Sequence, residues 1–228
     1  SVVYFTKDIS PEGLIRIYEA LGVEAQGKTA VKISTGESML SNNLSPELIG
    51  PLVKKIGGTL VECNTAYGGN RSQTANHRKA IEERGYNAIG TVDIMDEEGE
   101  IKIPVKDDKW IKYDIVGSHI QNYDFMVSLA HFKGHAMGGF GGVLKNQSIG
   151  VASSNGKVNI HSAGQVEVAN AQGDLKVVSD ALQIESVYIA PFIGVPILLM
   201  LLIFMLISTR QRKKHSKAYL NVIGQYKK

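Results

Sequence analysis

Apolar and polar residues alternate with two different periods along residues 1–164. Ser10-Pro11 and Ser45-Pro46 each place an N-cap residue and a first-turn proline before apolar residues at helical spacing. Together with shorter runs rich in β-branched residues, this pattern predicts helices at 11–21, 46–56 and 72–84 and strands at 29–33, 59–62, 91–95, 101–105 and 124–130. Such an alternation is typical of an α/β domain with a mainly parallel sheet and flanking helices.

A longer hydrophobic pattern follows this domain. Residues 187–208 form a run of 22 residues without a charged side chain. As a helix, such a run spans ~30 Å of hydrocarbon, and helices in the core of water-soluble domains rarely stay uncharged for this length. The sequence therefore predicts an α/β domain at 1–164, a linker at 165–186, one transmembrane helix at 187–208 and a basic tail at 209–228.

The charge distribution supports the same division. The tail carries seven of the 25 Lys and Arg residues and no acid, which leaves 18 basic against 22 acidic residues, a net charge of −4, for residues 1–208. We expect the tail to contact anionic lipid headgroups. It has no interleaved aromatic residues beyond Tyr219 and Tyr226, which argues against nucleic acid. The cluster RQRKKHSK after the span favours a cytoplasmic C-terminus, but residues 1–4 show no signal peptide, so the membrane side of the domain stays open.

Cysteine content limits the possible chemistry. The single cysteine, Cys63, excludes an internal disulfide framework, a zinc finger and a self-contained four-cysteine iron–sulfur site. We expect Cys63 to be a small buried residue and not a nucleophile, because no basic neighbour in the sequence activates it.

The densest group of chemically useful residues lies at 131–161, directly after the last predicted strand. Ligands of open α/β sheets gather at the carboxyl ends of strands, and a glycine-rich loop there brings backbone N–H groups close to an anion or a flat cofactor. The pattern is neither a Walker A motif nor a dinucleotide fingerprint. It predicts a ligand or cofactor site; the alternative is a glycine-rich turn beside core histidines. The candidate residues are Gly138, Gly139, Gly141, Gly142, Asn146, three lysines (Lys133, Lys145, Lys157) and three histidines (His131, His135, His161).

A second candidate is the polar loop 64–71, which follows the predicted strand 59–62. Asn70 and Arg71 in this loop could reach the same crevice. Alternatively, the loop is an ordinary βα turn and His77 in the next helix is solvated. Lys32 is expected to be a solvated lysine at a strand end.

Four segments then point to a known family: YFTKDISPEGLIRIYEALG, VKISTGE, NTAYGGNRSQTANHR and HFKGHAMGGFGGVLKNQSIGVASSNGK. In order and content they resemble an uncharacterised prokaryotic family, the domain of unknown function 362, over residues 1–163. Members of that family often continue into a ferredoxin-like domain with two 4Fe–4S centres, whose cysteines this chain lacks. The resemblance therefore implies no iron–sulfur centre here, and a membrane span is not typical of the family.

The glycine-rich segment also resembles, more remotely, the lactate racemases that use a nickel-pincer nucleotide. That similarity implies an acid/base role for His135, covalent attachment of the cofactor at Lys145 and a metal-ligand role for His161. Racemisation needs a second base on the opposite face of the substrate. Asn70 stands where the similarity calls for that histidine, so the resemblance stops short of the second base.

Two functional hypotheses follow. In the first, the domain is tethered to a membrane and binds a phosphate-bearing or metal-containing small ligand; the cofactor class is open between a transition metal and a nucleotide-derived group. In the second, it is a non-enzymatic redox-partner or scaffold domain of a membrane complex.

Overall fold

A four-stranded parallel sheet organises the domain, as the alternation of strands and helices predicts. The computed structural model describes residues 2–36, 43–135 and 139–164. The strands β1 (Thr29–Lys32), β2 (Thr59–Glu62), β3 (Val92–Ile94) and β6 (Phe125–Ser128) pair in the order β3-β2-β1-β6, all parallel. The predicted α/β class is confirmed.

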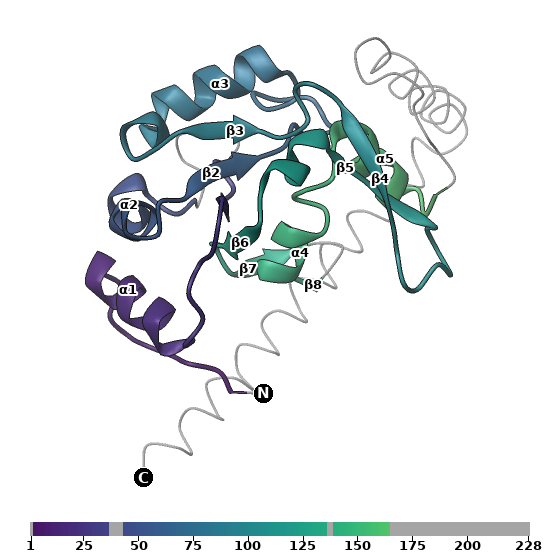
Figure 1. Cartoon of the computed structure of the whole chain (residues 1–228). Coiled ribbons are helices and arrows are strands. Elements are labelled where there is room, and N and C mark those ends of the chain that lie inside the picture. The colour runs from purple at the N-terminus through teal and green to yellow at the C-terminus, as the bar shows by residue number, and fades with distance from the viewer. Residues whose placement is uncertain (1, 37–42, 136–138, 165–228) are drawn as a thin grey trace, which may run out of the picture. The chain divides into compact units, whose positions relative to one another are not determined.

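Three helices cover one face of this sheet: α1 (Pro11–Ala20), α2 (Pro46–Lys55) and α3 (Thr74–Glu83). Ser10 and Ser45 cap α1 and α2 as predicted, since their side chains accept from the backbone N–H groups of Gly13 and Leu48. Figure 1 shows α2 and α3 beside β2 and β3, with α1 next to α2. The core between helices and sheet consists of Val31, Ile33, Ile49, Leu52, Val53, Leu60, Ile81, Tyr86, Val92, Ile94 and Leu129. A 3₁₀ turn, η1 (Tyr86–Ala88), follows α3.

A separate antiparallel hairpin contributes to the other side of the domain. Strand β4 (Glu100–Pro104), predicted at 101–105, pairs with β5 (Tyr113–Gly117), which the sequence pattern did not indicate. The 3₁₀ helix η2 (Ser118–Asn122) then leads to β6. Met95, Val116 and Val151 pack with Ala30 and Val61 of the main sheet in a second, smaller core. Successive residues of a strand point to opposite faces, so Ala30 and Val31 contribute to different cores.

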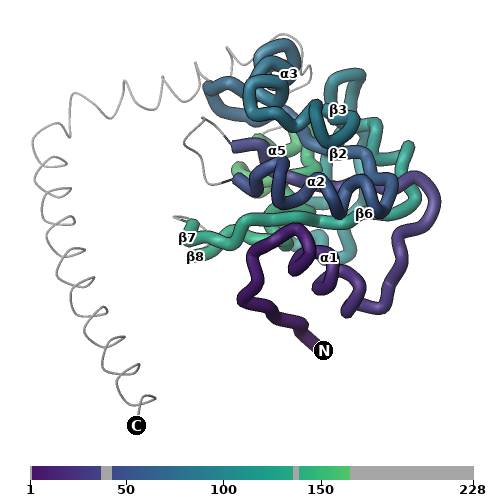
Figure 2. Tube along the Cα trace, turned by 90° about the vertical axis from the view of Figure 1, so that its left-hand side faces the viewer, coloured from purple at the N-terminus to yellow at the C-terminus, as the bar shows by residue number. Residues whose placement is uncertain are grey.

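The segment 131–161, for which the pattern predicts no elements, forms four. A short hairpin of β7 (Lys133–His135) and β8 (Gly139–Gly141) continues from the end of β6 (Figure 2). It is followed by α4 (Val143–Gln147) and α5 (Ser154–His161), and the Ser153 side chain caps α5. The pattern missed α5 because its apolar residues form no stripe at helical spacing.

The predicted linker at 165–186, transmembrane helix at 187–208 and basic tail at 209–228 lie outside the described residues. Within residues 2–36, 43–135 and 139–164, none of the helices combines the length and the apolar character that a bilayer span requires. The membrane anchor therefore stays a prediction.

Candidate functional site

The candidate site lies at the carboxyl edge of the parallel sheet. Lys32, Glu62 and Ser128 are the last residues of strands β1, β2 and β6, and β1 lies between the other two strands. Parallel strands end at the same edge, where open α/β sheets bind their ligands. The topology thus gathers polar side chains from distant parts of the sequence.

Glu62 is the centre of a buried charge network. Its Oε2 accepts a hydrogen bond from Lys32 Nζ at 2.8 Å, and its Oε1 accepts one from Arg71 Nη1 at 3.1 Å. The backbone N–H of Thr35 donates to Oε1 at 2.7 Å. Burial alone would raise the pKa of Glu62, but the charges of Lys32 and Arg71 outweigh it and hold this pKa well below its ordinary value. The carboxylate is therefore ionised and fully engaged.

Lys32 and His77 correct the sequence-based expectations. Lys32 is not solvated but 1% exposed, and its ammonium also binds the carbonyl of Ile33. His77 is not solvated either: it is 0% exposed, with Nδ1 3.1 Å from Asn64 Oδ1 and Nε2 3.4 Å from Thr35 Oγ1. Burial lowers the pKa of His77 to about 4, so the ring is neutral at pH 7. Both polar side chains can be buried because the fold supplies hydrogen-bond partners for them, Glu62 for Lys32 and Asn64 for His77.

A cavity of about 160 Å³ opens beside this network. The described residues in its wall include five cationic side chains and a single carboxylate, which is Glu62. Residues from the loop 64–71 also line it, which supports the interpretation that this loop reaches the crevice. The lining residues that carry the argument are Lys32, Glu62, Arg71, Lys133, Gly141, Gly142, Lys145, Asn146, Lys157 and His161.

The predicted loop residues divide in two. Arg71 lines the cavity and is buried, whereas Asn70 is exposed. Of the four predicted glycines, Gly141 and Gly142 line the cavity, Gly139 is exposed in β8 with a φ of 74°, and Gly138 lies outside the described residues. The cavity wall thus contains one of the two predicted loop residues and two of the four predicted glycines.

Asn146 fixes the position of α4 on the sheet edge. Its Nδ2 donates to the carbonyl of Lys32 at 3.0 Å and to Ser128 Oγ at 3.0 Å, and its Oδ1 accepts from Lys32 Nζ at 3.2 Å. The side chain was predicted to bind a cofactor. In the structure its amide joins the ends of β1 and β6 to α4, which holds the neighbouring Lys145 on the cavity wall.

The structure brings His135, Lys145 and His161 into one neighbourhood. Burial lowers the pKa of His161 at the end of α5, and the electrostatic influence of Lys145, then of His135, adds to this shift. Burial and the charges of Lys133 and Arg71 lower the pKa of Lys145 in the same way. Three residues from separate elements of the segment 131–161 (β7, α4 and α5) therefore influence one another electrostatically.

Two groups next to the predicted loops, Lys157 and Asp96, take up fixed positions in the fold, and only Lys157 was among the predicted site residues. Lys157, on α5, is buried, and its ammonium binds the carbonyl of Ala152. Asp96 accepts the backbone N–H groups of Asn64 at 2.9 Å and Ser154 at 3.1 Å, which ties the loop 64–71 to the start of α5. Lys157 was found through its place in the segment 131–161, whereas the sequence context of Asp96 carried no recognisable signal.

Cys63 matches its prediction. The side chain is buried, its thiol donates to the carbonyl of Val151 at 3.2 Å, and burial raises its pKa to about 12. A thiol with this pKa is a poor nucleophile at neutral pH, so Cys63 is a packing residue.

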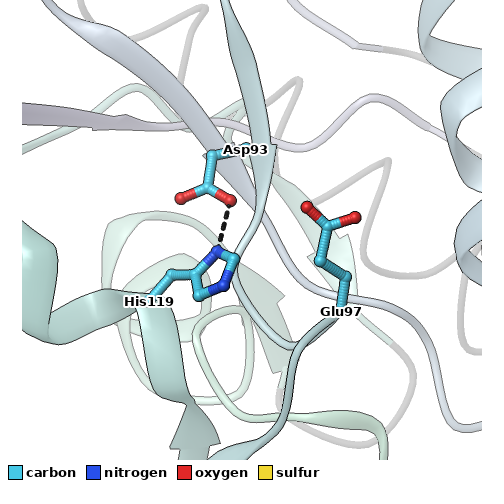
Figure 3. A group of neighbouring side chains, drawn as sticks. All are labelled: Asp93, Glu97 and His119. Carbon is cyan, nitrogen blue, oxygen red and sulfur yellow. Dashed lines mark hydrogen bonds and ion pairs between the residues drawn. The ribbon is translucent and has the colours of Figure 1, made fainter.

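A cluster away from the cavity, Asp93, Glu97 and His119, combines ligand types that metals use (Figure 3). His119 Nδ1 lies 2.8 Å from Asp93 Oδ1, and Arg78 pairs with Glu97. The hydrogen bond to Asp93 raises the pKa of His119, which favours the protonated ring. The His119–Asp93 contact joins η2 to β3, and Arg78 engages the third member of the cluster, Glu97.

Residues 29–222 match a family model described as a domain of unknown function (DUF362). The match confirms the resemblance given by the four sequence segments. It begins later than that resemblance and continues past residue 163, into the segments predicted as linker, transmembrane helix and tail. No curated protein and no solved structure matches the chain.

Proposed function

Because the chain belongs to the DUF362 family, whose description assigns no activity, we propose a function from the cavity: the domain binds a small anionic ligand that carries a phosphate group. The observation that supports this proposal is the charge of the wall. Five cationic side chains face one carboxylate, and that carboxylate already accepts hydrogen bonds from two of them.

Lys133 and Lys145 are the cations best placed to meet the ligand. In the part of the chain that the structure describes, neither forms an ion pair, whereas Lys32 and Arg71 are bound to Glu62. A phosphate oxygen accepts charge-assisted hydrogen bonds from lysine ammonium groups, which are stronger than neutral ones. The free lysines would supply affinity, while the buried network keeps the wall rigid.

The surroundings of His161 favour an anion over a metal ion. Burial is the main cause of its lowered pKa and the charges of Lys145 and Lys157 add to it, so a metal cation would bring a further positive charge next to two lysines. Among the described residues, the one group of three metal-ligand side chains is Asp93, Glu97 and His119, none of which lines this cavity. A transition metal at His161 does not fit this site, and we derive no step through one.

Phosphate binding tests the proposal. A calorimetric titration of the full-length protein with inorganic pyrophosphate is expected to show binding whose affinity falls as the salt concentration rises. Lys145→Met removes one charge-assisted contact and is expected to weaken binding by roughly 10-fold or more, from ~1.5–3 kcal/mol for such a hydrogen bond.

The matched control is Lys79→Met, because Lys79 on α3 is exposed and its ion pair with Glu83 lies on the helix surface. This variant is expected to bind like the wild type. Absence of heat at millimolar pyrophosphate, or equal affinity for Lys145→Met and the wild type, would contradict an anion site in this cavity.

We place the domain at a membrane surface through residues 187–208, with the basic tail on anionic headgroups. The full chain is expected to stay in the membrane fraction after an alkaline wash. The double variant Leu199→Arg/Leu202→Arg places two arginines near the centre of this run. Each arginine raises the free energy of inserting the helix into the membrane by ~2.5–3.5 kcal/mol, so the variant is expected to move to the soluble fraction. A wild-type chain found in the soluble fraction would contradict the anchor.

A scaffold role is the second candidate, and one observation favours it. The hairpin β7–β8 and helix α4 expose the apolar side chains of Phe132, Phe140, Val143 and Leu144, and the rings of Phe132 and Phe140 stack with centroids 5.5 Å apart. Exposed apolar groups in one region are typical of a contact with another macromolecule. A stable membrane complex containing a chain that binds no phosphate would favour this role over ligand binding.

A further inference from the structure

We propose that Lys145 forms a Schiff base with an aldehyde or ketone group of the ligand. This inference rests on the proposed function, because it names the chemical class of the ligand: a small phosphate-bearing carbonyl compound. Lys145 then acts as a nucleophile and not only as a charge that attracts the anion.

The first support is the state of the cavity lysines. Lys32 Nζ is bound to Glu62 and Asn146, and Lys157 Nζ is bound to the carbonyl of Ala152. Lys145 lines the same cavity, and the described residues provide no hydrogen bond or ion pair to its amine. Its nitrogen is therefore available to a ligand, while the nitrogens of the two buried lysines are occupied.

The second support is the like charge around Lys145. Lys133 and Arg71 act on it electrostatically, and no described carboxylate pairs with it. Desolvation and neighbouring cations favour the uncharged, nucleophilic form of an amine, and lysines that form Schiff bases are activated in this way. The wall thus both attracts an anion and favours a reactive amine.

The third support is the space beside the amine. A Cβ built on Gly141 would lie 3.8 Å from Lys145 Cδ and 3.9 Å from Lys133 Cγ, so glycine leaves the gap between the two lysine chains unfilled. Asn146 holds the backbone next to Lys145 by its hydrogen bonds to β1 and β6. Lys145 therefore lines the cavity from a helix that is held against the sheet edge, and Lys133 lies in the same wall.

The chemistry balances without a redox partner. The lone pair of Lys145 Nζ attacks the carbonyl carbon, and the carbonyl oxygen takes a proton, which gives a carbinolamine. Loss of that hydroxyl group with a proton from nitrogen releases one water molecule and forms the C=N bond. Lys133, whose stem flanks the same gap, would hold the phosphate of the ligand during these steps.

Reductive trapping on the full-length protein tests the proposal, with pyridoxal 5′-phosphate as the probe because it carries both an aldehyde and a phosphate. Treatment with borohydride converts the imine to a stable secondary amine, and peptide mass spectrometry locates it. At one equivalent of probe, most of the label is expected on Lys145, and Lys145→Arg is expected to lower total labelling by at least 5-fold. Lys79→Arg, the surface control, is expected to leave it unchanged.

Protection by inorganic phosphate separates the two claims. If both hold, millimolar phosphate lowers labelling of Lys145 by at least 5-fold and leaves that of Lys79 unaffected. If phosphate binds the wild type by calorimetry but the label spreads over surface lysines, the Schiff base is wrong and the anion site stands. If phosphate neither binds nor protects, the proposed function itself fails, and the inference fails with it.

Discussion

Replacing Glu62 with glutamine is expected to lower the free energy of unfolding by about 3–5 kcal/mol, the usual cost of removing one partner from a buried ion pair. Chemical denaturation of wild type and variant, compared at pH 7, measures this difference. The side chain keeps its volume and can still accept a hydrogen bond. One of its two acceptor oxygens becomes an NH2 group that faces a donor, so the cost reports the lost charge together with a lost hydrogen bond.

The size of the effect follows from what the substitution leaves behind. Lys32 and Arg71 are 1% and 8% exposed, and both donate to the Glu62 carboxylate. Without that charge, Lys32 stays buried with no carboxylate among the described residues that contact it, and Arg71 loses its contact with Glu62. A buried charge without a partner is far more costly than an exposed one.

The pH dependence of stability has the same origin. The pKa of Glu62 is lowered on folding, so its contribution is complete above the unfolded-state value near ~4.3 and is lost as the pH falls below it. His77, whose pKa burial lowers to about 4, adds a loss that begins as the pH falls below its unfolded-state value near ~6.5. The wild type is expected to lose stability on acidification from both groups, and Glu62→Gln to lose it less steeply below pH ~4.3.

Glu83→Gln is the matched control, since Glu83 makes only an exposed pair with Lys79 on α3. Exposed pairs of this spacing contribute ~0.3–0.5 kcal/mol. If Glu62→Gln cost no more than Glu83→Gln, the network at the sheet edge would not be a tightly coupled charge cluster, and the rigid wall assumed for the anion site would be wrong.

The fold could be predicted from the sequence where local signals agree. Ser10-Pro11 and Ser45-Pro46 indicated helix starts that the capping bonds confirm, and the apolar runs indicated all four strands of the parallel sheet. The hairpin strand β5 was missed because its five residues show no clean alternation and gain stability by pairing with β4. Short elements stabilised by tertiary contacts carry little local signal.

The site was predictable in part, for a different reason. The segment 131–161 was identified by its density of glycine, lysine and histidine, and its position after β6 placed it at the correct edge. Lys32 was expected to be solvated because lysine is rarely buried, and only the fold reveals that Glu62 and Asn146 lie beside it. Pairing across parallel strands and loops depends on register, which a sequence pattern does not specify.

Gly156→Ala is the second substitution expected to have a large effect, a loss of about 3 kcal/mol or more. A Cβ at this position would lie 1.9 Å from the carbonyl oxygen of Ile115 in β5. That oxygen cannot move freely, because it also accepts the Ser153 N–H at 2.9 Å at the start of α5. The helix must therefore shift away from the hairpin, against the hydrogen bonds of Ser153 and Asn155 to Glu100.

This shift also connects stability to the site, because α5 carries Lys157 and His161 to the cavity wall. Gly156→Ala is expected to weaken pyrophosphate binding as well as folding, measured by calorimetry at a temperature where the variant is still folded. Gly134→Ala, in the exposed strand β7 with no atom within 4 Å of a built Cβ, is the control and is expected to change stability by less than ~0.5 kcal/mol. A Gly156→Ala protein as stable as this control would mean that α5 packs less closely on β5 than the structure shows. Unchanged binding despite lower stability would mean instead that the anion is held by β7, β8 and α4 without α5.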